Sequence, residues 1–176
     1  MSDFGSQIEQ EIPKLRRYAR ALTRDATRAD DLVQSCLTRA LAKSHLWQPG
    51  TDLRAWLFTI LHNVHVNEVR HGLREGSAVP IDDEVLSLAV PATQHTSLEL
   101  RDLDRAIAHL AEEQRQVILL IGLEGMRYEE AAMVLQVPVG TIRSRLSRGR
   151  AELRRLLGMR EPEHRSSTLP VDRDAA

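Results

Sequence analysis

The 176-residue sequence has few aromatic residues and a single cysteine. Aromatics make up only 3% of the chain, so aliphatic residues and alanine must fill its cores, and these suit the apolar faces of amphipathic helices. One cysteine, Cys36, excludes an internal disulfide and any cysteine-rich zinc site. Because Cys36 lies between Leu32 and Leu37 in an apolar stretch, we expect a buried side chain and not a reactive thiol.

Long apolar runs and an excess of charge of one sign are also missing. The longest apolar stretch, residues 117–123, is too short to cross a bilayer, and the first residues lack the pattern of a secretory signal. We therefore expect a cytoplasmic protein without membrane insertion. The formal net charge of -1 neither favours nor excludes a nucleic-acid partner.

Motifs of catalysis and metal binding are absent as well. The sequence has no Gly-rich phosphate loop, no nucleophile elbow and no paired carboxylates, so we predict no enzymatic activity and no cofactor. Among its seven histidines, His62 and His65 are three residues apart. Neither has a cysteine or carboxylate partner at a familiar ligand spacing, so we predict no metal site.

Three amphipathic helices are expected in the first part of the chain. Apolar residues at three- and four-residue steps predict helices over residues 8–23, 28–44 and 53–73. A Gln-Pro-Gly-Thr turn precedes the third helix, and Thr51 or Asp52 can cap it. Three such helices with short connections form one compact bundle.

The composition changes after this bundle. Residues 75–100 contain no lysine or arginine but include two prolines and several acidic residues, which predicts a flexible linker over residues 77–97 with a helical turn near 85–88. A second helical region follows, and the polar residues 161–176 are expected to be disordered. Since no strand-like alternation persists, we predict an all-α protein of two small helical domains, a three-helix bundle over residues 1–76 and a four-helix domain over residues 98–160.

The strongest local signal lies in the second domain. Residues 128–135 can form a short helix, 136–138 a tight turn and 139–157 a longer helix that carries Pro138 at its start. The longer helix has an apolar side, made by Ile142, Leu146, Gly149, Leu153 and Leu156. Its opposite side is basic and hydroxylated, which is typical of a helix-turn-helix that inserts its second helix into the major groove.

A solvated basic face is the plainer alternative. The turn, the small Ala131-Ala132 pair and the restriction of basic residues to one side favour DNA binding. The residues predicted to contact duplex DNA are Thr141, Arg143, Ser144, Arg145, Ser147 and Arg148.

Several motifs together resemble the sigma-70 family of bacterial promoter-selecting factors. The segment GTIRSRLSRGR at 140–150, with YEEAA at 128–132, resembles region 4, which reads the −35 promoter element. ADDLVQ at 29–34 resembles region 2.2, and LRAWLFTIL at 53–61, followed by Asn63, resembles regions 2.3 and 2.4. Regions 1.1 and 3 have no counterpart, as in the extracytoplasmic-function (group 4) factors. The Pro-Gly-Thr turn and the run after it are similar to the alphaproteobacterial general-stress type.

The resemblance implies a protein that directs core RNA polymerase to specific promoters through −35 duplex binding and −10 melting. The third helix and the turn before it would bind the −10 element, with Trp47, Arg54, Asn63, Asn67 and Arg70. Trp47 could equally close the core of the bundle. The outer face of the second helix would bind the β′ clamp of the polymerase, with Asp31, Gln34, Thr38 and Arg39.

The resemblance implies two further partners, the β flap of the polymerase and an anti-sigma factor that covers the polymerase-binding surfaces. Two other functions stay open at this point. A stand-alone helix-turn-helix regulator would need no polymerase and would normally dimerise. A sigma-mimicking protein that binds an anti-sigma factor would usually carry a receiver domain and lose its DNA-contacting residues, whereas Arg143, Ser144 and Arg148 are present.

Overall fold

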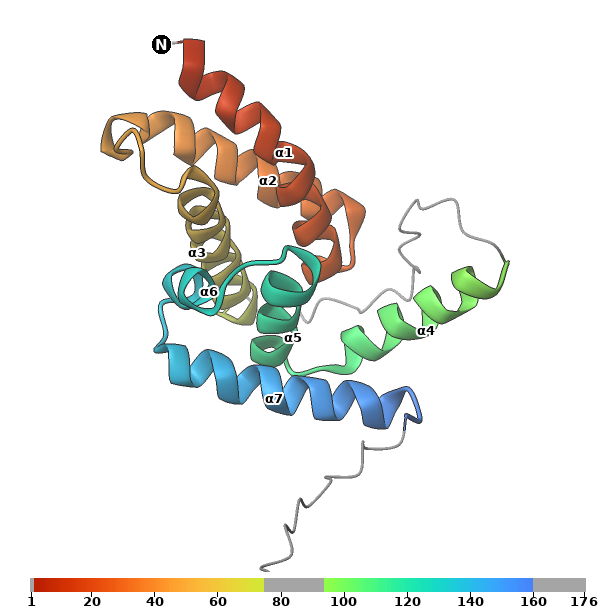
Figure 1. The fold of residues 1–176 in the computed structure, drawn as a ribbon. Helices are drawn as coiled ribbons and strands as arrows, with labels where there is room; N and C mark the ends of the chain where they lie inside the picture. The colour runs from red at the N-terminus through yellow and green to blue at the C-terminus, as the bar shows by residue number, and fades with distance from the viewer. Residues whose placement is uncertain (1, 75–93, 160–176) are drawn as a thin grey trace, which may run out of the picture.

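Seven α-helices form within residues 2–74 and 94–159, the residues that the computed structural model describes (Figure 1). In chain order they are α1 (Ser2–Thr23), α2 (Ala26–Ala42), α3 (Leu53–Arg74), α4 (Gln94–His109), α5 (Glu112–Ile118), α6 (Tyr128–Leu135) and α7 (Val139–Leu156). A 3₁₀ turn, Ser44–Leu46, follows α2, and a π-helical turn, Leu119–Leu123, extends α5. No strand occurs within the two described ranges, and the all-α prediction is confirmed.

The predicted boundaries agree closely with the structure where a turn residue or a cap marks them. The left-handed φ of 58° at Arg24 ends α1, and the Asp25 carboxylate accepts a hydrogen bond of 2.9 Å from the Arg28 amide to begin α2. Asp52 caps α3 in the same way by accepting from the Ala55 amide at 3.0 Å.

Two helices begin earlier than expected. α1 begins at Ser2 and not at residue 8, and α4 begins at Gln94, so residues 94–97 of the predicted linker are helical. Apolar periodicity identifies the buried face of a helix, not its terminus, which explains both differences. The rest of the predicted linker, its helical turn near 85–88 and the tail at 161–176 lie outside the described residues.

Helices α1, α2 and α3 form a three-helix bundle with an apolar core. Tyr18 and Phe58 are fully buried and meet edge to face, with ring centroids 5.3 Å apart. Cys36 is also fully buried, and its thiol donates to the Leu57 carbonyl at 3.4 Å. Burial raises the pKa of Cys36 to about 12. The expectation of a buried side chain is confirmed.

Helices α5, α6 and α7 form the core of the second half, with Val117, Val134 and Ile142 fully buried. α7 crosses α5 at Gly149, where a Cβ atom would lie only 3.1 Å from Cγ1 of Ile118. This close approach favours a residue without a side chain, because even the methyl group of alanine would make Ile118 move by a few tenths of an ångström. It packs α7 directly against α5 at the centre of the second half.

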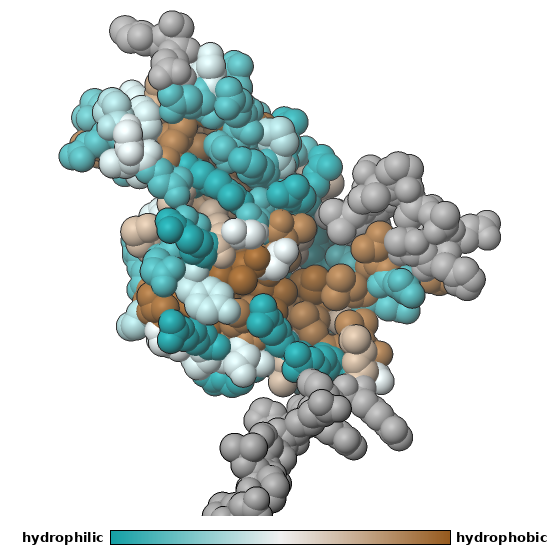
Figure 2. Space-filling model, viewed as in Figure 1, coloured by the Kyte–Doolittle hydropathy of each residue, from teal (hydrophilic) through white to brown (hydrophobic). Residues whose placement is uncertain are grey.

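The two halves are packed against each other. α3 contacts α6, α1 contacts the π-helical turn, and buried residues of both halves form one continuous apolar cluster. Figure 1 shows α6 between α3 and α7. On the face shown in Figure 2, apolar side chains gather near α5 and α4, while the side chains over α1 and α2 are mostly hydrophilic. The structure therefore contains an interface between the two halves. The prediction of two domains joined by a flexible linker did not include it.

Candidate nucleic-acid interface

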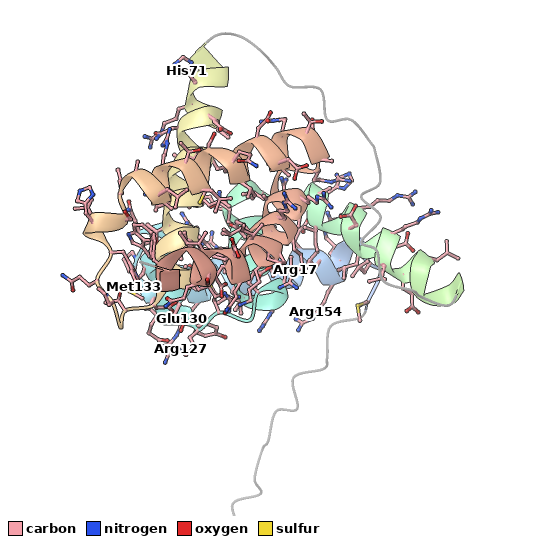
Figure 3. All side chains as sticks on the ribbon, turned by 90° about the horizontal axis from the view of Figure 1, so that it is seen from above. Arg17, His71, Arg127, Glu130, Met133 and Arg154 are labelled. Carbon is pink, nitrogen blue, oxygen red and sulfur yellow. The ribbon has the colours of Figure 1, made fainter. Side chains whose placement is uncertain are left out.

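The helix-turn-helix is built from α6, a three-residue turn and α7. At the start of α6, the Arg127 amide donates to Oε2 of Glu130 and the Arg127 side chain to Oε1, both at 2.8 Å (Figure 3). These bonds, the amide bond first, lower the pKa of Glu130. Gln136 ends α6 in the left-handed conformation, with φ 55° and ψ 43°, and α7 begins directly after Pro138. The predicted helix, turn and helix are confirmed.

The outward face of α7 carries the predicted DNA-contacting side chains. Ile142, Leu146 and Gly149 are buried beneath it, and Leu153 and Leu156 are half-buried. The Ser144 hydroxyl donates to the Thr141 carbonyl at 3.0 Å, and Arg148 reaches back to the Ser144 hydroxyl at 3.4 Å. The exposed members of the face are Arg143, Ser144, Ser147 and Arg148. The structure therefore presents two arginines and two serines together to solvent.

Arg145 differs from the other predicted DNA contacts. Its guanidinium forms an ion pair of 3.0 Å with Glu113 of α5, and only 18% of its side chain is exposed. The side chain therefore ties α7 to α5 and does not project from the outward face. The helical periodicity of the sequence could not identify this partner.

The residues predicted to contact the −10 element divide into exposed and engaged side chains. Asn63, Asn67 and Arg70 are exposed along α3. Arg54, at the start of α3, instead donates to the carbonyl of Glu124 and, at 3.2 Å, to its carboxylate Oε2. Arg54 thus holds the second half of the molecule, while the two asparagines, four residues apart, remain free to contact a ligand.

Trp47 lies in an aromatic cluster at one end of the first bundle. Its ring centroid is 5.0 Å from that of Phe4, which also lies 6.3 Å from Trp56. Trp47 is half-buried, and its indole N–H is buried without a hydrogen-bond partner among the described residues. This packing favours the interpretation in which Trp47 closes the core.

Two histidines of α3 lie at the interface with the second half. His65 Nε2 is 2.6 Å from Oε1 of Glu112 in α5, a carboxylate partner that no local spacing could reveal. Burial, and then the neighbouring charge of His65, lower the pKa of His62 to about 4. The hydrogen bond from His65 lowers the pKa of Glu112. Within residues 2–74 and 94–159, no group of three or more His, Cys, Asp or Glu side chains could hold a metal ion.

The predicted polymerase-binding face of α2 is solvent-facing. All four predicted contacts are exposed: Asp31, Gln34, Thr38 and Arg39. On the opposite side of the helix, Leu32, Val33 and Cys36 are buried in the bundle. The side chains of this face are therefore available to a partner.

The sequence patterns did not identify the contacts that join the two halves. The chief residue among them is Glu124, whose side chain is fully buried although it follows an apolar run at a turn where a solvated carboxylate would be ordinary. Its partners, Arg17 and Arg54, lie 107 and 70 residues away along the chain. An acidic residue directly after residues 117–123 was the only available signal, and a weak one.

Comparisons with known proteins agree with this geometry. The family model for the Sigma2 domain of PhyR matches residues 8–62, and the model for Sigma-70, region 4 matches residues 100–161. The chain is 40% identical over 150 residues to the ECF RNA polymerase sigma factor EcfG of Rhodopseudomonas palustris (strain TIE-1), covering 83% of this chain and 80% of that protein.

Two solved structures resemble the whole arrangement. The first is the sigma factor RpoE in complex with the anti-sigma factor NepR from Bartonella quintana, with a TM-score of 0.76, 38% identity, and coverage of 90% of this chain and 98% of that chain. The second is CnrH in complex with the cytosolic domain of CnrY, with a TM-score of 0.64, 28% identity, and coverage of 88% and 87%.

Proposed function

The chain belongs to the extracytoplasmic-function sigma factors of the sigma-70 family, and we propose that its helices divide promoter selection among three surfaces. As a sigma factor it directs core RNA polymerase to specific promoters. The single observation that carries the assignment to surfaces is the outward face of α7, where exposed Arg143, Ser144, Ser147 and Arg148 cover an apolar back. Its sequence pattern is similar to that of the alphaproteobacterial general-stress type.

We assign the −35 element to α7. Arginine can bind guanine bidentately in the major groove, and serine can bond to either a base or a phosphate. Arg148 and Arg143 supply the cationic groups, and the Ser144 hydroxyl lies between them along the helix. Arg145 supports this surface indirectly, because its ion pair with Glu113 holds α7 against α5.

We assign the −10 element to α3. Asn63 and Asn67 lie one turn apart on an exposed stretch of the helix, where their amides can hydrogen-bond to unstacked bases of the opened strand. Arg70 lies three residues beyond Asn67 and can contact a phosphate. Trp47 supports this surface as a packing residue of the same bundle.

We assign core polymerase binding to the exposed face of α2, with the β′ clamp as its partner and the β flap as the partner of the second half. A relative of similar structure, the sigma factor RpoE from Bartonella quintana, was solved in complex with an anti-sigma factor. We propose that an anti-sigma factor also regulates this chain by covering the same surfaces. The polymerase performs all the chemistry, so the chain itself needs no catalytic group, cofactor or metal.

We propose the cytoplasm, where the polymerase acts, as its location. No helix in the described part of the chain combines the length and the apolar character that crossing a membrane requires.

The two alternative functions are less well supported. A stand-alone regulator has no use for an exposed α2 face in a bundle that matches a sigma domain over residues 8–62. A sigma mimic has no use for the intact basic face of α7, which lies within the region 4 match at residues 100–161.

Run-off transcription is the direct test of the proposed function. Core polymerase with this chain should yield promoter-dependent transcripts from a genomic library, and neither component should do so alone. If no promoter-dependent product forms while the chain binds duplex DNA tightly without core polymerase, the stand-alone regulator is the correct function instead.

A further inference from the structure

The two arginines on the outward face of α7 are held in different ways. Arg148 donates through Nε to the Ser144 carbonyl and through Nη2 to the Ser144 hydroxyl, both at 3.4 Å. Arg143 instead lies over an aromatic ring, with its Cζ atom 6.0 Å from the ring centroid of Tyr128, the first residue of α6. A guanidinium at this distance is attracted by the negative face of the ring. One arginine is therefore held within α7, and the other by the first helix of the helix-turn-helix.

The contact with the ring leaves the hydrogen-bond donors of Arg143 available. The ring attracts the charge of the guanidinium, and this attraction requires none of its five N–H donors. Within residues 2–74 and 94–159, no ion pair or hydrogen bond joins the Arg143 guanidinium to another residue. Arg143 is thus restrained and keeps its full set of donors. Arg148, in contrast, must release its bonds to Ser144 before those donors can bind DNA.

Tyr128 can hold a neighbouring side chain because its own position is fixed. Its ring is half-buried and packs against the buried apolar cluster. The residue before it, Arg127, donates to the Glu130 carboxylate from its amide and from its side chain, both at 2.8 Å, which fixes the start of α6 (Figure 3). A ring anchored in α6 therefore supports a side chain on the outward face of α7.

Such support matters for reading a base. Bidentate recognition of guanine requires two N–H groups of the arginine to lie in one direction, toward the edge of the base. A long side chain that is free in solution loses conformational entropy when it is ordered in that direction, and a side chain that is already restrained loses less. A contact to a phosphate carries no sequence information directly. Restraint of Arg143 therefore favours the reading of a base.

We propose that Tyr128 is a positioning residue for −35 recognition, whose ring holds the Arg143 guanidinium in the direction that reads one base pair. This inference rests on the proposed assignment of the −35 element to α7. Tyr128 acts through Arg143 and needs no contact of its own with DNA. The ring alone supplies the attraction, so the tyrosine hydroxyl is not required for this role.

Packing alone is the plainer role for Tyr128, and it leads to different expectations. A packing residue stabilises the helix-turn-helix whatever side chain stands at position 143. A positioning residue affects base preference only while the Arg143 guanidinium is present. The two roles are therefore distinguished by combining substitutions at both positions.

The test measures base preference at every position of the −35 element. Core polymerase is combined with the full chain or with a variant, and each holoenzyme selects from promoter duplexes whose −35 segment is randomised. The remaining promoter sequence is one found by run-off transcription. Sequencing of the bound fraction gives the preference for each base. Arg143→Ala identifies the base pair that Arg143 reads, because preference should be lost there and kept elsewhere.

Tyr128→Leu keeps an apolar side chain but removes the ring. It should lower the preference at the base pair read by Arg143 by about two- to fivefold, the range expected for an exposed cation–π contact. The salt dependence of binding should not change, because no phosphate contact is removed. Tyr128→Phe should keep the wild-type preference, since it retains the ring. A loss in Tyr128→Phe would mean that the hydroxyl contacts DNA directly, and it would overturn the positioning role.

The double variant separates positioning from packing. In a chain that carries Arg143→Ala, Tyr128→Leu should have no further effect on base preference, because no guanidinium remains to be held. Val137→Ala is the matched control, at a half-buried residue of the turn that packs against the same cluster. It should lower the midpoint of thermal unfolding and leave base preference unchanged. The same change of preference in Val137→Ala, or an effect of Tyr128→Leu that persists without Arg143, would show that Tyr128 acts only through packing.

A measurement on the wild type tests the proposal even if Tyr128→Leu does not fold. NMR relaxation of the full chain should show that the Nε–H group of Arg143 is more ordered than that of Arg150, another exposed arginine of α7. Tyr128→Phe should keep this order. Equal mobility of the two arginines would overturn the proposal.

The outcomes also separate this inference from the proposed function. If the wild-type holoenzyme selects no −35 sequence, the assignment of that element to α7 is wrong, and the inference fails with it. If Arg143→Ala abolishes preference at one base pair and Tyr128→Leu leaves it intact, only the role of Tyr128 is refuted. If Arg143→Ala changes no preference, the inference is also overturned, because Tyr128 then has no base-reading side chain to position.

Discussion

The two halves of this protein use their charged residues in different ways. In α1–α3, aliphatic side chains and the Tyr18–Phe58 pair fill the core, and most charged side chains lie on the outside. In α4–α7, charged side chains also hold helices together. Arg115 donates to the carbonyls of Ile107, Ala108 and Leu110 at the end of α4, at 2.9 to 3.2 Å.

This difference changes how a basic residue should be interpreted. Arg145 and Arg148 are three residues apart on α7, and both belong to the predicted DNA-binding surface. Arg148 is exposed on the outward face, whereas Arg145 is mostly buried against Glu113. A basic residue of the second half can therefore be a structural contact as readily as a DNA contact, and in the first half Arg54 is engaged in the same way at the boundary with Glu124. The following variants test how far the two halves differ.

The largest effect is expected in the core of the first half. Phe58→Ala should lower the free energy of unfolding by about 4 kcal/mol, because it removes a fully buried ring and leaves a cavity beside Tyr18. Urea denaturation, monitored by circular dichroism and by tryptophan fluorescence, measures this loss of stability. Tryptophan fluorescence reports on the first half because both tryptophans lie there. Met133→Ala, at a side chain 58% exposed, is the control and should change stability by less than about 0.5 kcal/mol. Equal losses in the two variants would contradict an apolar core centred on Phe58.

In the second half, Arg115→Met should lower the free energy of unfolding by about 3 kcal/mol. The substitution keeps much of the side-chain volume but leaves the carbonyls at the end of α4, and that of Leu22, without their donor. The same denaturation experiment measures the loss. Arg105→Met, at an exposed arginine of α4, is the matched control. A stability equal to that of the control would mean that Arg115 does not hold these helices together.

For DNA binding, Arg148→Ala should weaken binding to a −35 duplex by about 2 kcal/mol and leave binding to core polymerase unchanged. Fluorescence anisotropy of a labelled duplex measures the first affinity. Anisotropy of the labelled chain titrated with core polymerase measures the second. Arg145→Ala should instead lower stability, because it leaves Glu113 without its partner. Loss of core binding in Arg148→Ala would contradict the assignment of separate surfaces.

The smallest effect is a pH dependence at the boundary between the halves. The pKa of His62 is lowered to about 4 in the folded protein, so the unfolded chain takes up a proton below its ordinary value of 6.5 before the folded chain does. Stability should therefore fall as the pH decreases from about 6.5 to 4. The pKa of Glu112 is also lowered, so protonation of this carboxylate causes a further loss of stability at the acidic end of the pH range.

Because His62 is partly exposed, its contribution should be about 1 kcal/mol. Thermal unfolding between pH 7.5 and pH 4 measures the slope, with the midpoint compared at each pH. His62→Gln should flatten it, while His45→Gln, at an exposed histidine, should not. An unchanged slope in His62→Gln would show that the imidazole is not held neutral by the fold.

Local patterns predicted much of the fold. The bounds of α6 agree with the prediction, and those of α7 differ by one residue, because a left-handed turn residue and a proline separate the two helices. The buried stripe of α7 and the exposed face of α2 also agree, since a helical period of 3.6 residues determines which side chains share a face. The residue ranges of the two domains and the roles of the DNA- and polymerase-binding residues stay predictions.

Long-range partners could not be predicted in this way. The sequence predicts Arg54 as a contact to the −10 element, and only the folded chain shows Glu124 beside it. His65 and Glu112 are 47 residues apart and meet across the same boundary. Such pairs depend on how the helices pack, and helical periodicity carries no information about which faces meet.

The amino-acid order determined the helices, their apolar faces and the helix-turn-helix, because each depends on residues within a few turns of one another. The family resemblance was readable from the same segments. Tertiary packing decided which charged residues are free, and it closed the two halves around Glu124. The physical reason is that the state of a charge depends on burial and on partners, and these are contributed by helices that are distant in the chain.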